Sequence, residues 1–353
     1  MTGVPAEHPS GGQAAARPAP GPGGSPEAPP RRIFSDIQPT GALHLGNWLG
    51  AVRNWVGLST THDAIFCIVD YHAVTVPYEP AEMPERVFEA ALTLLACGLD
   101  AERAILFVQS DVPEHTELAW VLTTLAPLGE LERMTQFKEK SEAYGVQAGL
   151  FVYPLLQAAD ILLYKADAVP VGEDQLQHLE LTREVARRFN RAFGPTFPEP
   201  RALLTKAPRI LGLDARGKMS KTNPEQAVFL LDAPEAIRKK LAGAFTDPAR
   251  KRRYDPGNPD ICNVFALHHH VSTADEIARV DRTCRTGELG CFEDKMSLAE
   301  NLIAALAPVR ERAAGLRADP EGVRAVLRRG AERARSIAAG TMDEVRRRMG
   351  LRA

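Results

Sequence analysis

Unbroken apolar runs alternate with segments of helical spacing through the first two thirds of this 353-residue chain. A run without polar alternation is typical of a parallel strand that is buried on both faces. Between two runs, segment 84–98 has a proline at its start and a glycine at its end, as expected for a helix. The alternation predicts an α/β fold with a doubly wound parallel sheet. The predicted strands are 33–37, 64–70, 104–111 and 168–175.

The strand pattern stops near residue 222, and the remaining sequence has mainly helical spacing. We therefore predict a catalytic domain of the α/β type over 31–222 and a helical C-terminal domain over 223–353. Residues 1–30 contain eight prolines and six glycines and no periodic apolar pattern. Such a segment cannot bury enough apolar surface to fold, so we expect a disordered tail. It also lacks the apolar core of a signal peptide.

Composition excludes several classes of protein. The formal net charge is only −2, so a nucleic-acid partner would have to bind a local patch. Residues 301–353 offer one, with twelve arginines, although solvated helix faces would explain them equally well. Five cysteines without a Cys-x-x-Cys pair argue against a disulfide framework or a zinc site and fit a reducing cytoplasm. No apolar run approaches the roughly 18 residues of a membrane span.

Polar side chains follow each predicted strand. Because the carboxyl ends of parallel strands border the ligand crevice in open α/β sheets, we expect these side chains to converge on one site. The residues are Ser35, Asp36 and Gln38; Asp70 and His72; Gln109 and Ser110; and Asp174 and Gln175.

The segment "TGALHLGNWLGAV" (40–52) lies where the first strand turns into a helix. A helix start directs free backbone N–H groups toward the crevice and suits a phosphate. His44 and Asn47 are one turn apart, so both could reach one triphosphate. The dinucleotide and P-loop glycine patterns are absent. Alone, this His-x-Gly-Asn sequence more often indicates a helix cap and core packing than a phosphate site.

The segment "GKMSKT" (217–222) lies at the predicted boundary between the domains. Lys218 and Lys221 would supply positive charge where a pyrophosphate leaves. The alternative is an ordinary solvated loop.

Together the two motifs resemble the paired signatures of class I aminoacyl-tRNA synthetases. From Ile33 onward the chain resembles the bacterial tryptophanyl members of that class. The matching segments are, in order, "FSDIQPTGALHLGNWLGAV", "CIVDYHAVTV", "GELERMTQFKEKS", "AADILLY", "VPVGEDQLQHLELTREVARRFN" and "KMSKT". The resemblance implies a Rossmann-like catalytic domain, ATP with Mg²⁺ bound mainly through the phosphates, and activation of tryptophan for transfer to tRNA(Trp).

The resemblance also implies roles for individual residues. The catalytic set is His44, Asn47, Lys140, Lys218 and Lys221. The ATP-binding set adds Gln38, Gly46, Gly172, Asp174 and Gln175. The tryptophan pocket comprises Phe34, His72, Tyr153, Gln157, Asp160, Val169, Val171 and Gln175, with Asp160 as the acceptor of the indole N–H. A helical domain that meets the tRNA anticodon, a homodimer and a cytoplasmic location complete the expectation.

Three positions depart from the usual pattern of the family. Asp36 stands where glycine is common, Gln157 where methionine is usual, and Thr222 where serine is usual. The spacing Tyr153, Gln157, Asp160 resembles the recognition helix of tyrosyl-tRNA synthetases, whereas "VGEDQLQH" resembles the tryptophanyl enzymes. A tyrosyl enzyme, a small nucleotidylyltransferase and a non-catalytic RNA-binding paralogue are the alternatives.

Overall fold

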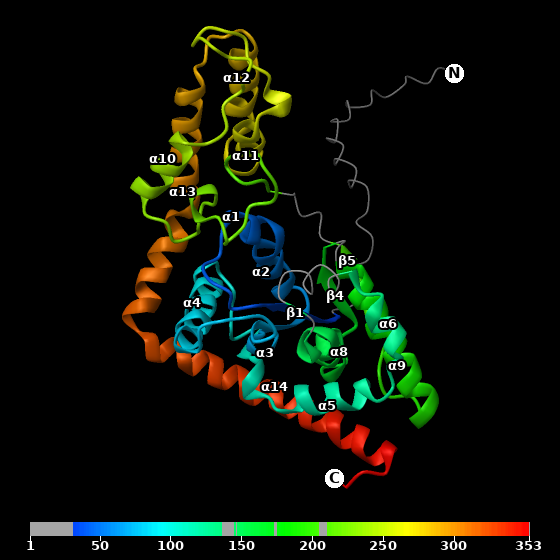
Figure 1. The fold of residues 1–353 in the computed structure, drawn as a ribbon. Coiled ribbons are helices and arrows are strands. Elements are labelled where there is room, and N and C mark those ends of the chain that lie inside the picture. The colour runs from blue at the N-terminus through cyan, green and yellow to red at the C-terminus, as the bar shows by residue number, and fades with distance from the viewer. Residues whose placement is uncertain (1–30, 136–144, 146, 173–174, 205–209, 353) are drawn as a thin grey trace, which may run out of the picture. The chain divides into compact units, whose positions relative to one another are not determined.

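Five parallel strands form a sheet in the order β3-β2-β1-β4-β5 (Figure 1). The computed structural model describes residues 31–135, 145, 147–172, 175–204 and 210–352, so the predicted tail lies outside the described residues. The chain starts in the middle of the sheet and builds outward on both sides, which confirms the predicted doubly wound topology. The strands are β1 Arg32–Ile37, β2 Asp63–Ile68, β3 Ile105–Val108, β4 Ala168–Val171 and β5 Arg201–Leu204.

The four predicted strands form, and their ends differ from the prediction. β1 pairs with β2 over its whole length, from Arg32 opposite Asp63 to Ile37 opposite Ile68. β3 and β4 end several residues before the predicted limits, so Gln109 and Ser110 lie in a 3-10 turn and Gln175 lies directly before α9. The edge strand β5 was not predicted, because its four residues are half-exposed and lack a long apolar run.

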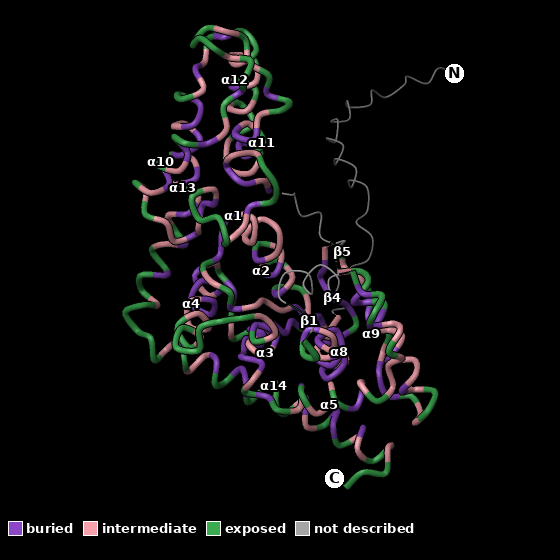
Figure 2. Tube along the Cα trace, in the orientation of Figure 1, coloured by how far each residue is buried: buried purple, intermediate pink, exposed green. Residues whose placement is uncertain are grey.

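Helices cover both faces of the sheet, because neighbouring residues of a strand point to opposite sides. Ile33 and Phe66 pack with residues of α2, α4 and α13 on one face. Phe34 and Phe107 pack with residues of α5, α8 and α9 on the other. Figure 2 shows the buried residues concentrated around β1 and α8. The helices are α1 Leu45–Asn47, α2 Arg53–Ser59, α3 Asp70–Ala73, α4 Met83–Ala96, α5 Glu114–Thr123, α6 Leu128–Glu132, α8 Ala148–Leu163, α9 Leu176–Phe193, α10 Pro234–Ala242, α11 Asn263–Val271, α12 Ala274–Arg285, α13 Cys291–Ala318 and α14 Pro320–Met349.

The last helix, α14, returns to the sheet and packs against β3 and α5 (Figure 1). Gly330 makes this close approach possible, since a side-chain carbon there would collide with the carbonyl oxygen of Leu106 on β3. Residues 31–353 cluster as one compact unit, and the predicted division into two domains at 222 stays a prediction. Between residues 31 and 352, none of the described helices combines the length and apolar character that a membrane span needs.

Candidate active site

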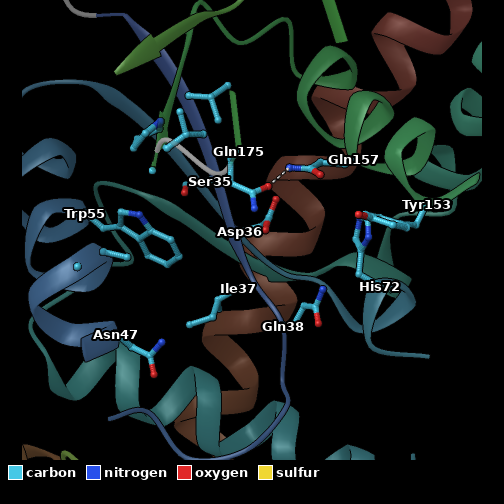
Figure 3. A pocket seen from close by; sticks show the side chains of 16 residues that line it. Ser35, Asp36, Ile37, Gln38, Asn47, Trp55, His72, Tyr153, Gln157 and Gln175 are labelled. Carbon is cyan, nitrogen blue, oxygen red and sulfur yellow. Dashed lines mark hydrogen bonds between the residues drawn. The ribbon is translucent and has the colours of Figure 1, made fainter. Parts of the chain in front are cut away.

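A cavity of about 400 Å³ opens at the carboxyl ends of β1 and β4 (Figure 3). It lies where the chain order reverses between two neighbouring strands, the usual ligand position in this type of sheet. β1 contributes one wall, α8 a second and the turn after β4 a third. The lining residues are Ser35, Asp36, Ile37, Gln38, Asn47, Gly50, Ala51, Trp55, His72, Tyr153, Gln157, Val169, Pro170, Val171, Gly172 and Gln175.

Most predicted pocket residues that the structure describes lie on this cavity. The ATP set contributes Gln38, Asn47, Gly172 and Gln175, and the tryptophan set contributes His72, Tyr153, Gln157, Val169 and Val171. The side-chain amides of Gln157 and Gln175 approach each other, at 3.4 Å from Nε2 to Oε1. Ser35 also lines the cavity, as expected of a polar residue near the end of the first strand, whereas Gly50, Ala51 and Trp55 line it and were not in the predicted site. Lys140 and Asp174 lie outside the described residues.

The first motif forms a reciprocal helix cap. His44 precedes α1, and its Nδ1 accepts a hydrogen bond from the Asn47 backbone N–H at 3.3 Å. The Asn47 Oδ1 accepts one from the His44 backbone N–H at 3.1 Å. Gly46 leaves room for the imidazole, since an added Cβ would lie 3.0 Å from that ring. The motif therefore does cap the helix, as the alternative interpretation expects. Its Asn47 also lines the cavity, so capping and ligand binding are compatible.

The cap fixes the chemistry of His44. Burial, followed by the charges of Lys221 and Lys218, lowers the pKa of His44 to about 4. The imidazole is therefore neutral at pH 7, and because Nδ1 accepts a hydrogen bond, the proton lies on Nε2. His44 can thus donate one hydrogen bond to an anion without acting as a general acid.

The second motif contacts the first directly. Lys221 Nζ donates to the Gly41 carbonyl oxygen at 3.0 Å and to Thr40 Oγ1 at 3.3 Å. The backbone N–H of Leu45 donates to Val228 O at 2.8 Å, which ties the chain after the lysine loop to α1. Burial and then Arg86 lower the pKa of Lys221 to about 8. Lys218 is exposed, so the loop offers one anchored and one free ammonium group.

Asp160 lies behind the cavity wall rather than on it. Its carboxylate is fully buried and accepts hydrogen bonds from three side chains. The donors are His72 Nε2 at 2.7 Å, His115 Nδ1 at 2.6 Å and Gln109 Nε2 at 2.7 Å. Burial opposes ionisation of Asp160, but the bonds from His115 and His72 outweigh it and lower the pKa to about 2. Asp160, the residue expected to accept the indole N–H, therefore already has three hydrogen-bond donors from the protein. Of the four residues in this network, His72 lines the cavity.

Phe34 is also absent from the cavity wall. Its side chain is fully buried and stacks on Tyr164, with ring centroids 5.5 Å apart. The sequence did not single out His115, because a histidine within the first turn of a helix carries no special signal by itself. It became part of the site only through the folding of α5 against α8.

Comparisons with known proteins agree with this geometry. The family described as tRNA synthetases class I (W and Y) matches residues 27–307. The chain is 49% identical to a Tryptophan--tRNA ligase of Deinococcus radiodurans over 325 residues, covering 90% of this chain and 98% of the relative. It is 46% identical to the Tryptophan--tRNA ligase 2 of Streptomyces avermitilis, covering 90% and 96%. The crystal structure of tryptophanyl-tRNA synthetase from Campylobacter jejuni complexed with ADP and tryptophan superposes with a TM-score of 0.84 at 31% identity, covering 91% and 100%.

Proposed function

The chain belongs to the class I tRNA synthetases of the tryptophan and tyrosine group, and we infer from this that it joins L-tryptophan to tRNA(Trp) with the use of ATP. The observation that carries this function is the contact of Lys221 with Thr40 and Gly41, which precede the His-x-Gly-Asn residues, beside a cavity at the switch point of the sheet. Such an arrangement can hold the two ends of one triphosphate next to an amino acid.

The reaction has two steps. A carboxylate oxygen of tryptophan attacks the α-phosphorus of ATP, the bond to the β-phosphate oxygen breaks, and pyrophosphate leaves. The 2′-hydroxyl of the terminal tRNA adenosine then attacks the carbonyl carbon of the adenylate, and AMP leaves. The attacking carboxylate is already charged at pH 7, so the first step needs no general base. Catalysis is therefore positioning together with stabilisation of charge.

We propose separate roles for the two motifs. The Nε2 proton of His44 and the Asn47 amide would bind phosphate oxygens, while Lys218 and Lys221 would stabilise the charge on the departing pyrophosphate. Gln38, Gly46, Gly172 and Gln175 would complete the nucleotide site, with Asp174 and Lys140 as further members from the sequence.

We propose that Mg²⁺ enters with ATP. Among the residues that the structure describes, no group of three or more His, Cys, Asp or Glu side chains could hold a metal ion. Mg²⁺ commonly takes most of its ligands from substrate phosphates and water, so a protein cage is not required. The ion would neutralise part of the triphosphate charge.

ATP–pyrophosphate exchange with each amino acid in turn tests the function. We expect exchange with tryptophan and none with tyrosine. Exchange with tyrosine would favour the tyrosyl alternative, and no exchange with any amino acid would favour a non-catalytic paralogue.

We propose that the helical part of the chain after residue 222 binds the tRNA, in a homodimer in the cytoplasm. An open hollow of about 410 Å³ there is lined by Lys251, Arg252 and Phe292, among others. Phe292 and the nearby Tyr254 are 63% and 73% exposed. Basic side chains beside exposed aromatic rings suit an unpaired stretch of RNA, whose bases stack on such rings.

The double substitution Lys251→Ala with Arg252→Ala tests this surface. Loss of two phosphate contacts is expected to raise the KM for tRNA by about tenfold at low salt and to reduce its salt dependence. ATP–pyrophosphate exchange should be unchanged, since it needs no tRNA. A control pair in the α/β part of the chain, exposed Arg191→Ala with Arg201→Ala, removes the same charge outside the proposed tRNA-binding region. An equal effect of both pairs, or no effect of the first, would contradict the assignment.

A further inference from the structure

Asp36 places a carboxylate inside the cavity. It lies on β1, and its side chain points into the space near Gln175 (Figure 3). Of the cavity-lining residues that the structure describes, Asp36 alone is acidic. None of the described hydrogen bonds and ion pairs between residues 31 and 352 involves this carboxylate, in contrast to Asp160, which has three donors. A ligand that fills the cavity therefore meets an unpaired anion.

The unpaired anion carries an energetic cost. Burial raises the pKa of Asp36 to about 6, because a desolvated carboxylate without a partner is unfavourable in its charged form. The charged and titratable groups that face it are His72 on α3, His115 on α5 and Asp160 on α8, and their effects partly cancel. The anion would also repel the triphosphate of ATP. A cationic group on the amino-acid substrate would offset both the desolvation of the Asp36 carboxylate and its repulsion of the triphosphate.

We propose that Asp36 recognises the α-ammonium group of the amino-acid substrate, an inference that rests on the proposed function and deepens it. The ammonium is the one formal positive charge on tryptophan, and Asp36 supplies the matching negative charge in the described cavity wall. Gln157 and Gln175 offer only amide dipoles there. The ammonium and the reacting carboxylate share one carbon, so an ion pair at Asp36 also limits where the carboxylate can lie. Asp36 would thus position the substrate without touching the phosphates.

The pH dependence of binding follows with a definite sign. Asp36 must be ionised to pair with the ammonium, so affinity for tryptophan should fall as the pH drops through about 6. Binding should release protons near that pH, because the ammonium stabilises the charged carboxylate. Above it, affinity should level off.

A comparison of three ligands isolates the contribution of the ammonium group to binding. Tryptophan carries the ammonium and the carboxylate, tryptamine the ammonium alone, and indole-3-propionate the carboxylate alone. The test is equilibrium binding of each ligand, without ATP, to the full chain and to its Asp36→Asn variant. We expect roughly 10- to 50-fold weaker binding of tryptophan and tryptamine to the variant, as for loss of a charged hydrogen bond. Indole-3-propionate should bind equally well or more tightly.

Every other pattern overturns the proposal. Equal weakening of all three ligands would assign Asp36 to the indole N–H or to the shape of the pocket. Unchanged binding of tryptophan would exclude any contact. Asp275→Asn, which makes the same carboxylate-to-amide change at an exposed position on α12 outside the cavity lining, serves as the matched control and should leave the binding of all three ligands unchanged. If Asp36→Asn does not fold, the unsubstituted chain decides, because its affinity for tryptamine but not for indole-3-propionate must fall below about pH 6. Failure of exchange with tryptophan in the unsubstituted chain would instead refute the proposed function.

Discussion

Replacing Asp160 by asparagine is expected to lower kcat/KM for tryptophan by about 10³-fold, since it removes the negative charge that three buried hydrogen bonds share, and a hydrogen bond to a charged group is worth roughly 1.5–3 kcal/mol. An asparagine amide group would face the N–H of His72 or His115 with a donor of its own. At least one of these buried donors would then lose its acceptor. His72 lines the cavity, so its displacement should reach the tryptophan site. The KM for ATP should change little, because the described hydrogen bonds of His44, Asn47 and Lys221 go to other partners than this network.

The measurement is ATP–pyrophosphate exchange with tryptophan and ATP varied separately, alongside thermal unfolding. Tyr164→Phe is a matched control, since it removes the hydroxyl 2.8 Å from His115 Nε2 and leaves all three bonds to Asp160 intact. We expect a small effect on exchange from that control. An equal rise in both KM values for Asp160→Asn would assign Asp160 to general stability and not to the tryptophan site.

The sequence predicted the parts of the site that depend on short segments. The cap of His44 and Asn47 is local, and the lysine loop is recognisable from six residues. Strand ends that carry polar groups likewise predicted Gln38, His72 and Gln175 at one edge of the sheet, as the structure has them. Each of these features follows from chain neighbours or from the topology of a parallel sheet.

The parts that the sequence did not predict depend on packing between distant segments. The role of Asp160 at the indole stays a prediction, and what the sequence did not show is that Gln109 and His115, 51 and 45 residues away, both donate to its carboxylate. Their approach is a result of α5 packing on α8. Phe34 was expected in the pocket, yet its position on β1 directs it to the opposite face from Ile33, against Tyr164. The return of α14 to β3 similarly depends on one glycine, Gly330.

Replacing Lys221 by methionine is expected to lower kcat of the exchange reaction by about 10²- to 10³-fold, the usual effect of removing one preorganised charge from a transition state. Methionine keeps most of the length of the side chain and removes the ammonium. The substitution also breaks the contacts with Gly41 and Thr40 that hold the lysine loop against the first motif. The lost ammonium charge and the lost loop contacts both concern the stabilisation of the departing pyrophosphate, so the KM for tryptophan should change little.

The pH profile separates the charge of Lys221 from its role as an anchor. Its pKa is lowered to about 8, first by burial and then by Arg86, so the charged form is lost as the pH rises through that value. In the unsubstituted chain, kcat/KM for ATP should therefore decline above about pH 8, since this ratio reports groups of the free enzyme. Lys221→Met should abolish the decline. Lys218→Met is the matched control, because it removes an exposed ammonium from the same loop and leaves both Lys221 contacts in place. A decline that persists in Lys221→Met, or disappears in Lys218→Met, would show that another group titrates and that Lys221 acts only as an anchor.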